Sequence, residues 1–168
     1  MSEKRSSSTE YFYDTFASPI GVLYLLCSGK TLYEIDFQKP TGALRKGTAP
    51  PLLEKELKEY FENGREEFTQ KIAFRKGTAF EKAVWEALRE IAYGETRTYK
   101  WLAETIGKPK ASRAVGQALS RNPIPIIIPC HRIIESDGSL GGYSGGIDIK
   151  RRLLDMEYYG KLSKKSDS

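Results

Sequence analysis

The sequence predicts an α+β protein in two parts, a small N-terminal α/β layer and a C-terminal part that is mostly helical. Short apolar segments with strand-like alternation, joined by turns, fill the chain up to residue 37, whereas helical periodicity dominates after residue 77. A chain of 168 residues is long enough for one ordinary domain or for two small ones that share an interface. We expect the boundary at Arg75-Lys76-Gly77, between domains at 10–75 and 76–160.

Three segments of the first domain have the sequence of β-strands. Residues 11–16, 22–27 and 31–37 are apolar and aromatic, and the turns between them are short, which predicts an antiparallel meander. The Ser-rich, charged residues 1–9 that precede them have no periodicity, so we expect a disordered lead-in.

An amphipathic helix is predicted after these strands. From Leu52 to Phe61 the apolar residues share one face, and Asn63-Gly64 supplies a stop signal. Residues 68–74 alternate between apolar and polar side chains and could add one more strand to the same sheet. Nothing in this domain carries recognisable chemistry, and Cys27, in an apolar strand, is interpreted as a core residue.

The second domain begins with a helix start signal. Thr78 has Glu81 three residues later, which is the spacing of a capping box, and a helix is predicted from there through Ile91. Two short helices follow, at 98–106 and 111–120. A pair of this kind joined by a Gly/Pro turn matches the helix-turn-helix pattern, although any helical hairpin would look alike.

Positive charge is concentrated on this helix pair. The net charge of the chain is +5, and between residues 97 and 121 a single acid, Glu104, faces six basic residues. Such a cluster is typical of a phosphate-binding surface, although a solvated basic face would have the same composition. The basic residues are Arg97, Lys100, Lys108, Lys110, Arg113 and Arg121.

A glycine-rich loop and a last helix complete the chain. An irregular segment as long as 135–146 in a compact domain suggests a binding loop or a lid over a pocket. Asp148 to Tyr158 has helical spacing, with Tyr158 on the buried side, and Gly160 is expected to end this helix. Residues 161–168 then form a charged tail.

Candidate chemistry lies between residues 126 and 134, in the sequence IIIPCHRII. Two β-branched runs flank Cys130, His131 (the one histidine of the chain) and Arg132, which predicts a buried strand or packed core segment with a turn at Pro129. A thiol is nucleophilic as thiolate, and a neighbouring imidazole and positive charge can favour that form. The more common fate of an isolated cysteine is to fill the core as a small residue.

Further motifs stand in order around this segment. They are Tyr93-Gly94-Glu95-Thr96, Ser112-Arg113-Ala114-Val115-Gly116, Asn122-Pro123-Ile124-Pro125, Gly142-Tyr143-Ser144-Gly145-Gly146 and Leu153-Leu154 with Glu157. Together they span about half of the chain and resemble the O6-alkylguanine-DNA alkyltransferases, a DNA repair family that removes methyl groups from guanine. The chain departs from the family at Ala92, where proline is usual, and lacks ligands for the structural zinc that some members bind.

The resemblance implies an RNase H-like N-terminal sheet with its helix and a winged-helix-like C-terminal domain. It also implies direct transfer of the alkyl group from O6-methylguanine, and from O4-methylthymine, in double-stranded DNA to Cys130. Because a thioether is a very poor leaving group, the protein would act once, without cofactor or metal. We expect a monomer without membrane association, cytoplasmic and nucleoid-associated, or nuclear in a eukaryote.

The same resemblance implies roles for individual residues. His131 would act as base through a bridging water, with Glu157 orienting its imidazole. Arg113 would fill the space that the flipped nucleotide leaves, while Tyr99 crowds its phosphate or donates a proton to guanine N3. Asn122 would brace the turn before the cysteine. Further contacts are expected from Ala114 and Gly116 with DNA, and from Ile133, Tyr143, Ser144 and Gly145 around the pocket.

Two other functions fit parts of the sequence. A cysteine hydrolase would also use Cys130, His131 and an acid, but it would turn over and would not need the basic helix pair. A DNA-binding regulator would need the helix pair and leave Cys130 in the core. Alkyltransferase-like proteins that bind damaged DNA lack the cysteine, so its presence favours transfer.

Overall fold

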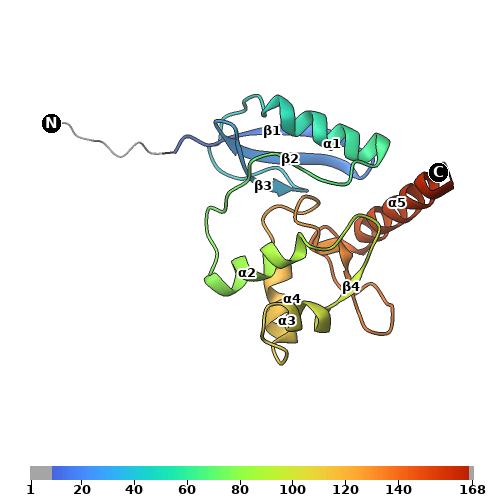
Figure 1. Ribbon diagram of the computed structural model, residues 1–168. Helices are drawn as coiled ribbons and strands as arrows, with labels where there is room; N and C mark the ends of the chain where they lie inside the picture. The colour runs from blue at the N-terminus through green and yellow to red at the C-terminus, as the bar shows by residue number, and fades with distance from the viewer. Residues whose placement is uncertain (1–8, 167–168) are drawn as a thin grey trace.

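The computed structural model describes residues 9–166, so the lead-in predicted at 1–9 lies, apart from Thr9, outside the described residues. Figure 1 shows two parts: a sheet with one helix, and below it a group of helices with a long last helix at their side. The predicted α+β class is confirmed.

The N-terminal sheet is the predicted antiparallel meander. β1 (Phe12–Ser18) pairs with the central strand β2 (Gly21–Ser28), which pairs with β3 (Thr31–Asp36). α1 (Pro51–Asn63) covers the sheet. Gly64 caps its C-terminus with a φ of 68°, a left-handed conformation that glycine adopts readily because it has no Cβ. The sheet and α1 share one core, formed by Leu23, Leu25, Cys27, Leu32, Leu53, Leu57 and Tyr60.

The additional strand considered at 68–74 does not form. This segment makes one isolated bridge, between Ile72 and Leu32 of β3. The reason lies in Glu56 of α1, a fully buried carboxylate that accepts the backbone N–H groups of Thr69 (3.0 Å) and Gln70 (2.9 Å). Two donors that a strand ladder would use are therefore directed at a side chain instead.

The second part starts at the predicted capping box. In α2 (Ala79–Leu88) the Thr78 hydroxyl accepts from the Glu81 N–H, and the Glu81 carboxylate accepts from the Thr78 N–H, both at 3.0 Å. The helix ends at Leu88 rather than at the predicted Ile91. Residues 89–91 donate their N–H groups to carbonyls three residues back, so the α-helix tightens into turns.

The predicted helix-turn-helix consists of α3 (Tyr99–Thr105) and α4 (Ser112–Ser120). Trp85 of α2 donates its indole N–H to the Ala118 carbonyl of α4 at 2.9 Å, which fixes the pair against the preceding helix. A small parallel ribbon that was not predicted joins β4 (Arg97–Thr98) to β5 (Ile133–Ile134). Strands of two residues are too short to show a periodic pattern.

The last helix is longer than predicted. α5 (Ile147–Ser166) runs through Gly160 into the predicted charged tail. Gly160 is a packing residue rather than a helix end, because a Cβ there would lie 2.5 Å from the Tyr93 hydroxyl. Tyr158, expected inside, is 56% exposed, whereas Leu153 and Glu157 take the inward positions one turn apart. Among residues 9–166, no helix has the length and apolarity to cross a membrane.

Glu56 gives a test of this account of the 68–74 segment. We expect Glu56→Gln to lower the free energy of unfolding by about 2 kcal/mol, because the buried amide loses the Arg65 ion pair and turns a donor toward other donors. The exposed Glu54→Gln of the same helix is the control, with a change below about 0.5 kcal/mol. Denaturant titrations measure both.

The effect should also depend on pH. Although burial raises the pKa of Glu56, hydrogen bonds from Thr69 and Gln70 and the charge of Arg65 hold it below the usual 4.5. Its contribution is therefore present above pH 4.5 and is lost as the pH falls through the lower folded-state value. Equal unfolding free energies for the two glutamine variants at pH 7 would contradict this role.

Candidate active site and DNA-binding surface

The backbone before the cysteine is an irregular, buried turn. Residues 124–128 are buried without forming a strand. Of the two structures predicted for the segment before Cys130, a buried strand or a packed core segment, the second is therefore present. Ile126 has a φ of 78°, a conformation that β-branched residues rarely adopt. Asn122 spans this turn: its amide donates to the Ile128 carbonyl (2.8 Å) and accepts from the Ile124 N–H (3.0 Å). Cys130–Arg132 then form a single 3₁₀ turn, η1.

Cys130 lies at the wall of a cavity of about 240 Å³. The cavity combines the first residue of α3, one face of α4, the cysteine turn and the glycine-rich loop. Its lining residues are Tyr99, Gly116, Leu119, Ser120, Cys130, Gly142, Tyr143 and Ser144. A cavity of this size, lined by apolar atoms together with several hydroxyl groups and a thiol, suits a small ligand.

The thiol is not a preformed thiolate. Burial raises the pKa of Cys130 to about 11, although a hydrogen bond with the Asn122 side chain and the charge of Lys150 act in the opposite direction. The thiol is therefore protonated at neutral pH, and its reaction needs an acceptor for the proton. The surroundings of Cys130 do not favour the thiolate as the sequence suggested. Cys27 is fully buried in the sheet, and burial raises its pKa to about 12.

His131 is fully buried behind the cysteine and pairs with α5. Its Nε2 lies 2.8 Å from Glu157 Oε2, the partner that the resemblance implied. Burial lowers the pKa of His131, and the nearby charges of Arg132 and Lys150 lower it further against the pull of Glu157. The ring is therefore neutral at pH 7. Because the carboxylate accepts from Nε2–H, the lone pair sits on Nδ1, which has no hydrogen-bond partner among residues 9–166.

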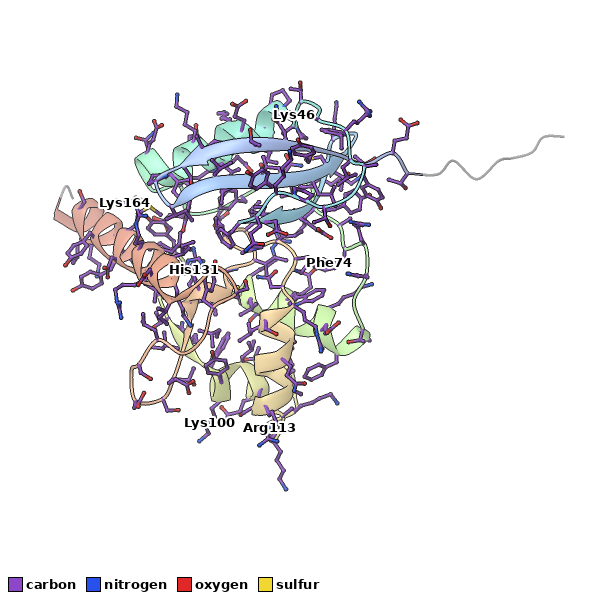
Figure 2. The ribbon with its side chains drawn as sticks, turned by 180° about the vertical axis from the view of Figure 1, so that it is seen from behind. Lys46, Phe74, Lys100, Arg113, His131 and Lys164 are labelled. Carbon is purple, nitrogen blue, oxygen red and sulfur yellow. The ribbon has the colours of Figure 1, made fainter. Side chains whose placement is uncertain are left out.

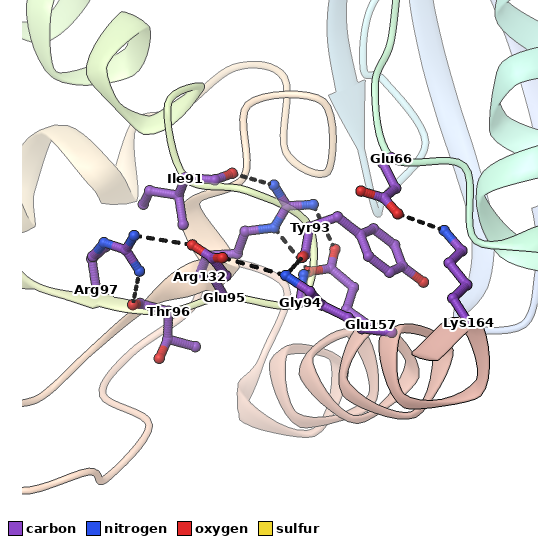
Figure 3. Close-up of polar contacts among 11 residues, drawn as sticks. Glu66, Ile91, Tyr93, Gly94, Glu95, Thr96, Arg97, Arg132, Glu157 and Lys164 are labelled. Atoms are coloured by element: carbon purple, nitrogen blue, oxygen red, sulfur yellow. Dashed lines mark hydrogen bonds and ion pairs between the residues drawn. The ribbon is translucent and has the colours of Figure 1, made fainter. Parts of the chain in front are cut away.

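Glu157 is ionised within the protein interior. Burial alone raises the pKa of a carboxylate, but the hydrogen bonds and charges of His131 and Arg132 hold the pKa of Glu157 far below its usual range. Arg132 donates to Oε1 at 2.8 Å and to Oε2 at 2.9 Å, and also to the Ile91 carbonyl at 2.7 Å. Figure 3 shows Arg132 between that carbonyl and α5.

Two members of this network were missed from the sequence. Arg132 stood beside the predicted pair without a role, and Tyr60 was recognised only as an apolar position of α1. The Tyr60 hydroxyl donates to Glu157 Oε2 at 2.5 Å. A 97-residue separation gives no sequence signal for this contact, whereas a charged residue inside an apolar run is a signal that could have identified Arg132.

The glycine-rich loop is held from within by another missed residue. Lys150 of α5 is fully buried and donates to the carbonyls of Leu140 and Gly142. Two of the glycines are required by contacts. A Cβ on Gly141 would lie 2.9 Å from the Tyr99 hydroxyl, and a Cβ on Gly145 would lie 2.7 Å from the Phe37 ring.

The structure brings only some of the predicted site residues together at the cavity. Tyr99, Gly116, Tyr143 and Ser144 line the cavity with Cys130, whereas Ile133 is buried outside it and Gly145 packs against the sheet domain. Arg113 and Ala114 are exposed on α4. The exposure of Ala114 leaves it accessible for the DNA contact that the resemblance implied.

Within the described part of the chain, two of the six residues of the basic cluster form ion pairs, and four do not. Arg97 pairs with Glu95 at 3.0 Å and Arg121 with Glu81 at 3.1 Å, which neutralises two of the six charges. The other four are exposed and form no ion pair within the part of the chain that the structure describes: Lys100, Lys108, Lys110 and Arg113. Figure 2 shows Lys100 and Arg113 at the end of the molecule opposite the sheet, with His131 between. Within 9–166 no His, Cys, Asp and Glu side chains group as metal ligands.

Both parts of the chain match known protein-family models. Residues 11–75 match the family model "6-O-methylguanine DNA methyltransferase, ribonuclease-like domain". Residues 79–159 match the model "6-O-methylguanine DNA methyltransferase, DNA binding domain".

Relatives match over nearly the whole chain. The methylated-DNA–protein-cysteine methyltransferase of Methanosarcina barkeri is 49% identical, over 87% of this chain and 96% of its own. The Haemophilus influenzae protein of the same name is 45% identical over 89% of this chain and 87% of its own. The crystal structure of Mycobacterium tuberculosis OGT in complex with DNA superposes with a TM-score of 0.84 at 41% identity, covering 89% of this chain and 94% of that one. The chain therefore belongs to the methylated-DNA–protein-cysteine methyltransferase family.

Proposed function

We propose that this protein repairs DNA by taking the alkyl group of O6-methylguanine onto Cys130, once per molecule. The observation that carries the proposal is the position of the cysteine: Cys130 lines a cavity of about 240 Å³ whose other wall includes α4, the helix that carries the exposed Arg113. Family membership supports the same reaction, since the relatives are methylated-DNA–protein-cysteine methyltransferases. O4-methylthymine is a second substrate in this proposal.

The transfer couples nucleophilic attack to loss of the thiol proton. The sulfur of Cys130 forms a bond to the methyl carbon while the bond from that carbon to guanine O6 breaks, and its electrons return to the base. The proton passes to the lone pair on His131 Nδ1, through a bridging water, and Glu157 stabilises the imidazolium that forms. A protonated Tyr99 hydroxyl, whose pKa burial raises, is available to donate to guanine N3.

The guanine must leave the base stack before this reaction can occur. We assign Arg113, exposed on α4, to the space left in the duplex, and Tyr99 to the rotation of the nucleotide toward the cavity. Ala114 and Gly116 would contact DNA on the same face. Tyr143 and Ser144 would hold the base, with the backbone carbonyls of Cys130 and Ile133 accepting from its amine.

The proposed unit is a monomer. One chain supplies the thiol, the base and the helix pair, in domains at 10–75 and 76–160, and the proposed reaction needs no cofactor or metal. We place the protein with chromosomal DNA, in the nucleoid of a cytoplasm or in a nucleus.

Stoichiometry is the main test. Incubation with duplex DNA that contains one O6-methylguanine should add one methyl group to Cys130, located by peptide mass spectrometry, and should plateau at one event per protein. Cys130→Ser should abolish transfer and leave DNA binding within about twofold, because the exposed basic residues lie on α3, on α4 and in the turn between them. Demethylation by the serine variant, or repeated turnover, would instead favour a hydrolase-like mechanism.

The flipping role of Arg113 is tested by comparing substrates. Arg113→Ala should slow methyl transfer from duplex DNA by about tenfold or more, while transfer from free O6-methylguanine stays within about twofold, since the free base needs no flipping. The matched control is Lys55→Ala, which removes an exposed positive charge on α1, far from Arg113 in the sequence. Equal losses on both substrates would remove Arg113 from the flipping step.

The proton requirement predicts a pH dependence for the DNA-free protein. With a thiol pKa near 11, alkylation of Cys130 by iodoacetamide should accelerate by about tenfold per pH unit between pH 7 and pH 9, following the thiolate fraction. Mass spectrometry of separate peptides distinguishes Cys130 from Cys27. A rate that levels off below pH 8 would show that the thiolate is already formed.

A further inference from the structure

Tyr60 connects the N-terminal domain to the proposed base. It comes from α1, is 1% exposed, and donates its hydroxyl to the same Glu157 oxygen that accepts from His131 Nε2. A buried backbone hydrogen bond, from the Ile35 N–H to the Pro123 carbonyl at 2.9 Å, also joins the two parts of the chain. Among the described residues, the other side-chain hydrogen bonds between the parts, such as Arg152 to the Pro19 carbonyl and Lys164 to Glu66, are exposed. The Tyr60 contact is therefore the buried one that reaches the site.

The Glu157 carboxylate receives five hydrogen bonds. Oε2 accepts from Tyr60, His131 and Arg132, and Oε1 accepts from Arg132 and from the Gly94 N–H at 3.2 Å. Burial, together with the charge of Glu157, raises the pKa of Tyr60 well above its usual value. Tyr60 is therefore a neutral donor at neutral pH.

We propose that Tyr60 is a positioning residue for alkyl transfer; this proposal rests on the proposed function of Cys130. Its hydroxyl fixes Glu157 Oε2 against His131 Nε2, and so keeps the imidazole in the tautomer that leaves Nδ1 as the base. It also shares the charge of that oxygen, which limits how strongly the carboxylate stabilises a protonated His131. The sheet domain thereby contributes a side chain to the reaction.

The hydroxyl can be separated from the packing role of the ring. The Tyr60 ring lies 5.0 Å from Phe61, 5.6 Å from Phe68 and 6.1 Å from Tyr93, measured between ring centroids. Phenylalanine preserves these contacts. Tyr93 provides the matched control: it is 2% exposed in the same aromatic group, and no hydrogen bond joins its hydroxyl to Glu157 within the described chain.

The experiment compares Tyr60→Phe with Tyr93→Phe in the full chain. Single-turnover transfer from O6-methylguanine DNA should slow by about tenfold in Tyr60→Phe and by less than about twofold in Tyr93→Phe, with DNA affinity unchanged in both. With one donor fewer, Oε2 should favour protonated His131, so the low-pH limb of the rate should move to higher pH. A purely structural role would not move this limb.

A second readout uses the fact that His131 is the one histidine of the chain. The ¹⁵N resonances of labelled histidine report one imidazole, and titration of the DNA-free protein should show the Nε2–H tautomer in wild type and a higher imidazole pKa in Tyr60→Phe. Identical titrations and rates in wild type and Tyr60→Phe would overturn the positioning role. Failure of the wild type to transfer any methyl group would instead overturn the proposed function itself.

Discussion

The buried carboxylate of Glu157 is the constraint on which the active site depends. Burying an ionised carboxylate without partners carries a large desolvation cost. Here five hydrogen bonds compensate the loss of hydration of Glu157. The donors come from α1, from the turn after α2 and from η1, while the acceptor is on α5. Satisfying one charge therefore fixes four segments that are far apart in sequence, and the tautomer of His131 follows from the result.

The interior that orders His131, the proposed base, also keeps Cys130, the proposed nucleophile, protonated. Burial raises the pKa of Cys130 and lowers that of His131, so the neutral thiol and neutral imidazole are the stable pair at pH 7. Such a pair is well suited to a reaction that happens once. In the proposed reaction the thiolate forms as the proton leaves, when an alkyl group is already in the cavity, and a protonated thiol is protected from unrelated electrophiles before then.

The glycine-rich loop opposite the cysteine is held by backbone contacts. Lys150 holds the loop through backbone carbonyls, so its closed shape does not depend on the side chains that face the cavity. Gly141 and Gly145 let the loop approach Tyr99 and Phe37, which ties the cavity wall to α3 on one side and to the sheet domain on the other. The N-terminal domain thus touches the site twice, at the loop and at Tyr60.

Sequence alone determined the fold class, the meander, the capping box at Thr78 and the helical hairpin at 98–120, because each rests on local periodicity or on a local capping signal. The pairing of His131 with Glu157 came only from the resemblance of the ordered motifs to a known family. Sequence alone failed where a distant side chain decides the local outcome. Glu56 accepts the N–H groups of residues 69 and 70 and prevents a strand there, and the Tyr93 side chain lies against Gly160, in the middle of α5, where a Cβ would not fit. Arg132, Lys150 and Tyr60 gained their roles only in the folded chain, since a buried hydrogen bond between residues far apart leaves no periodic trace in either segment.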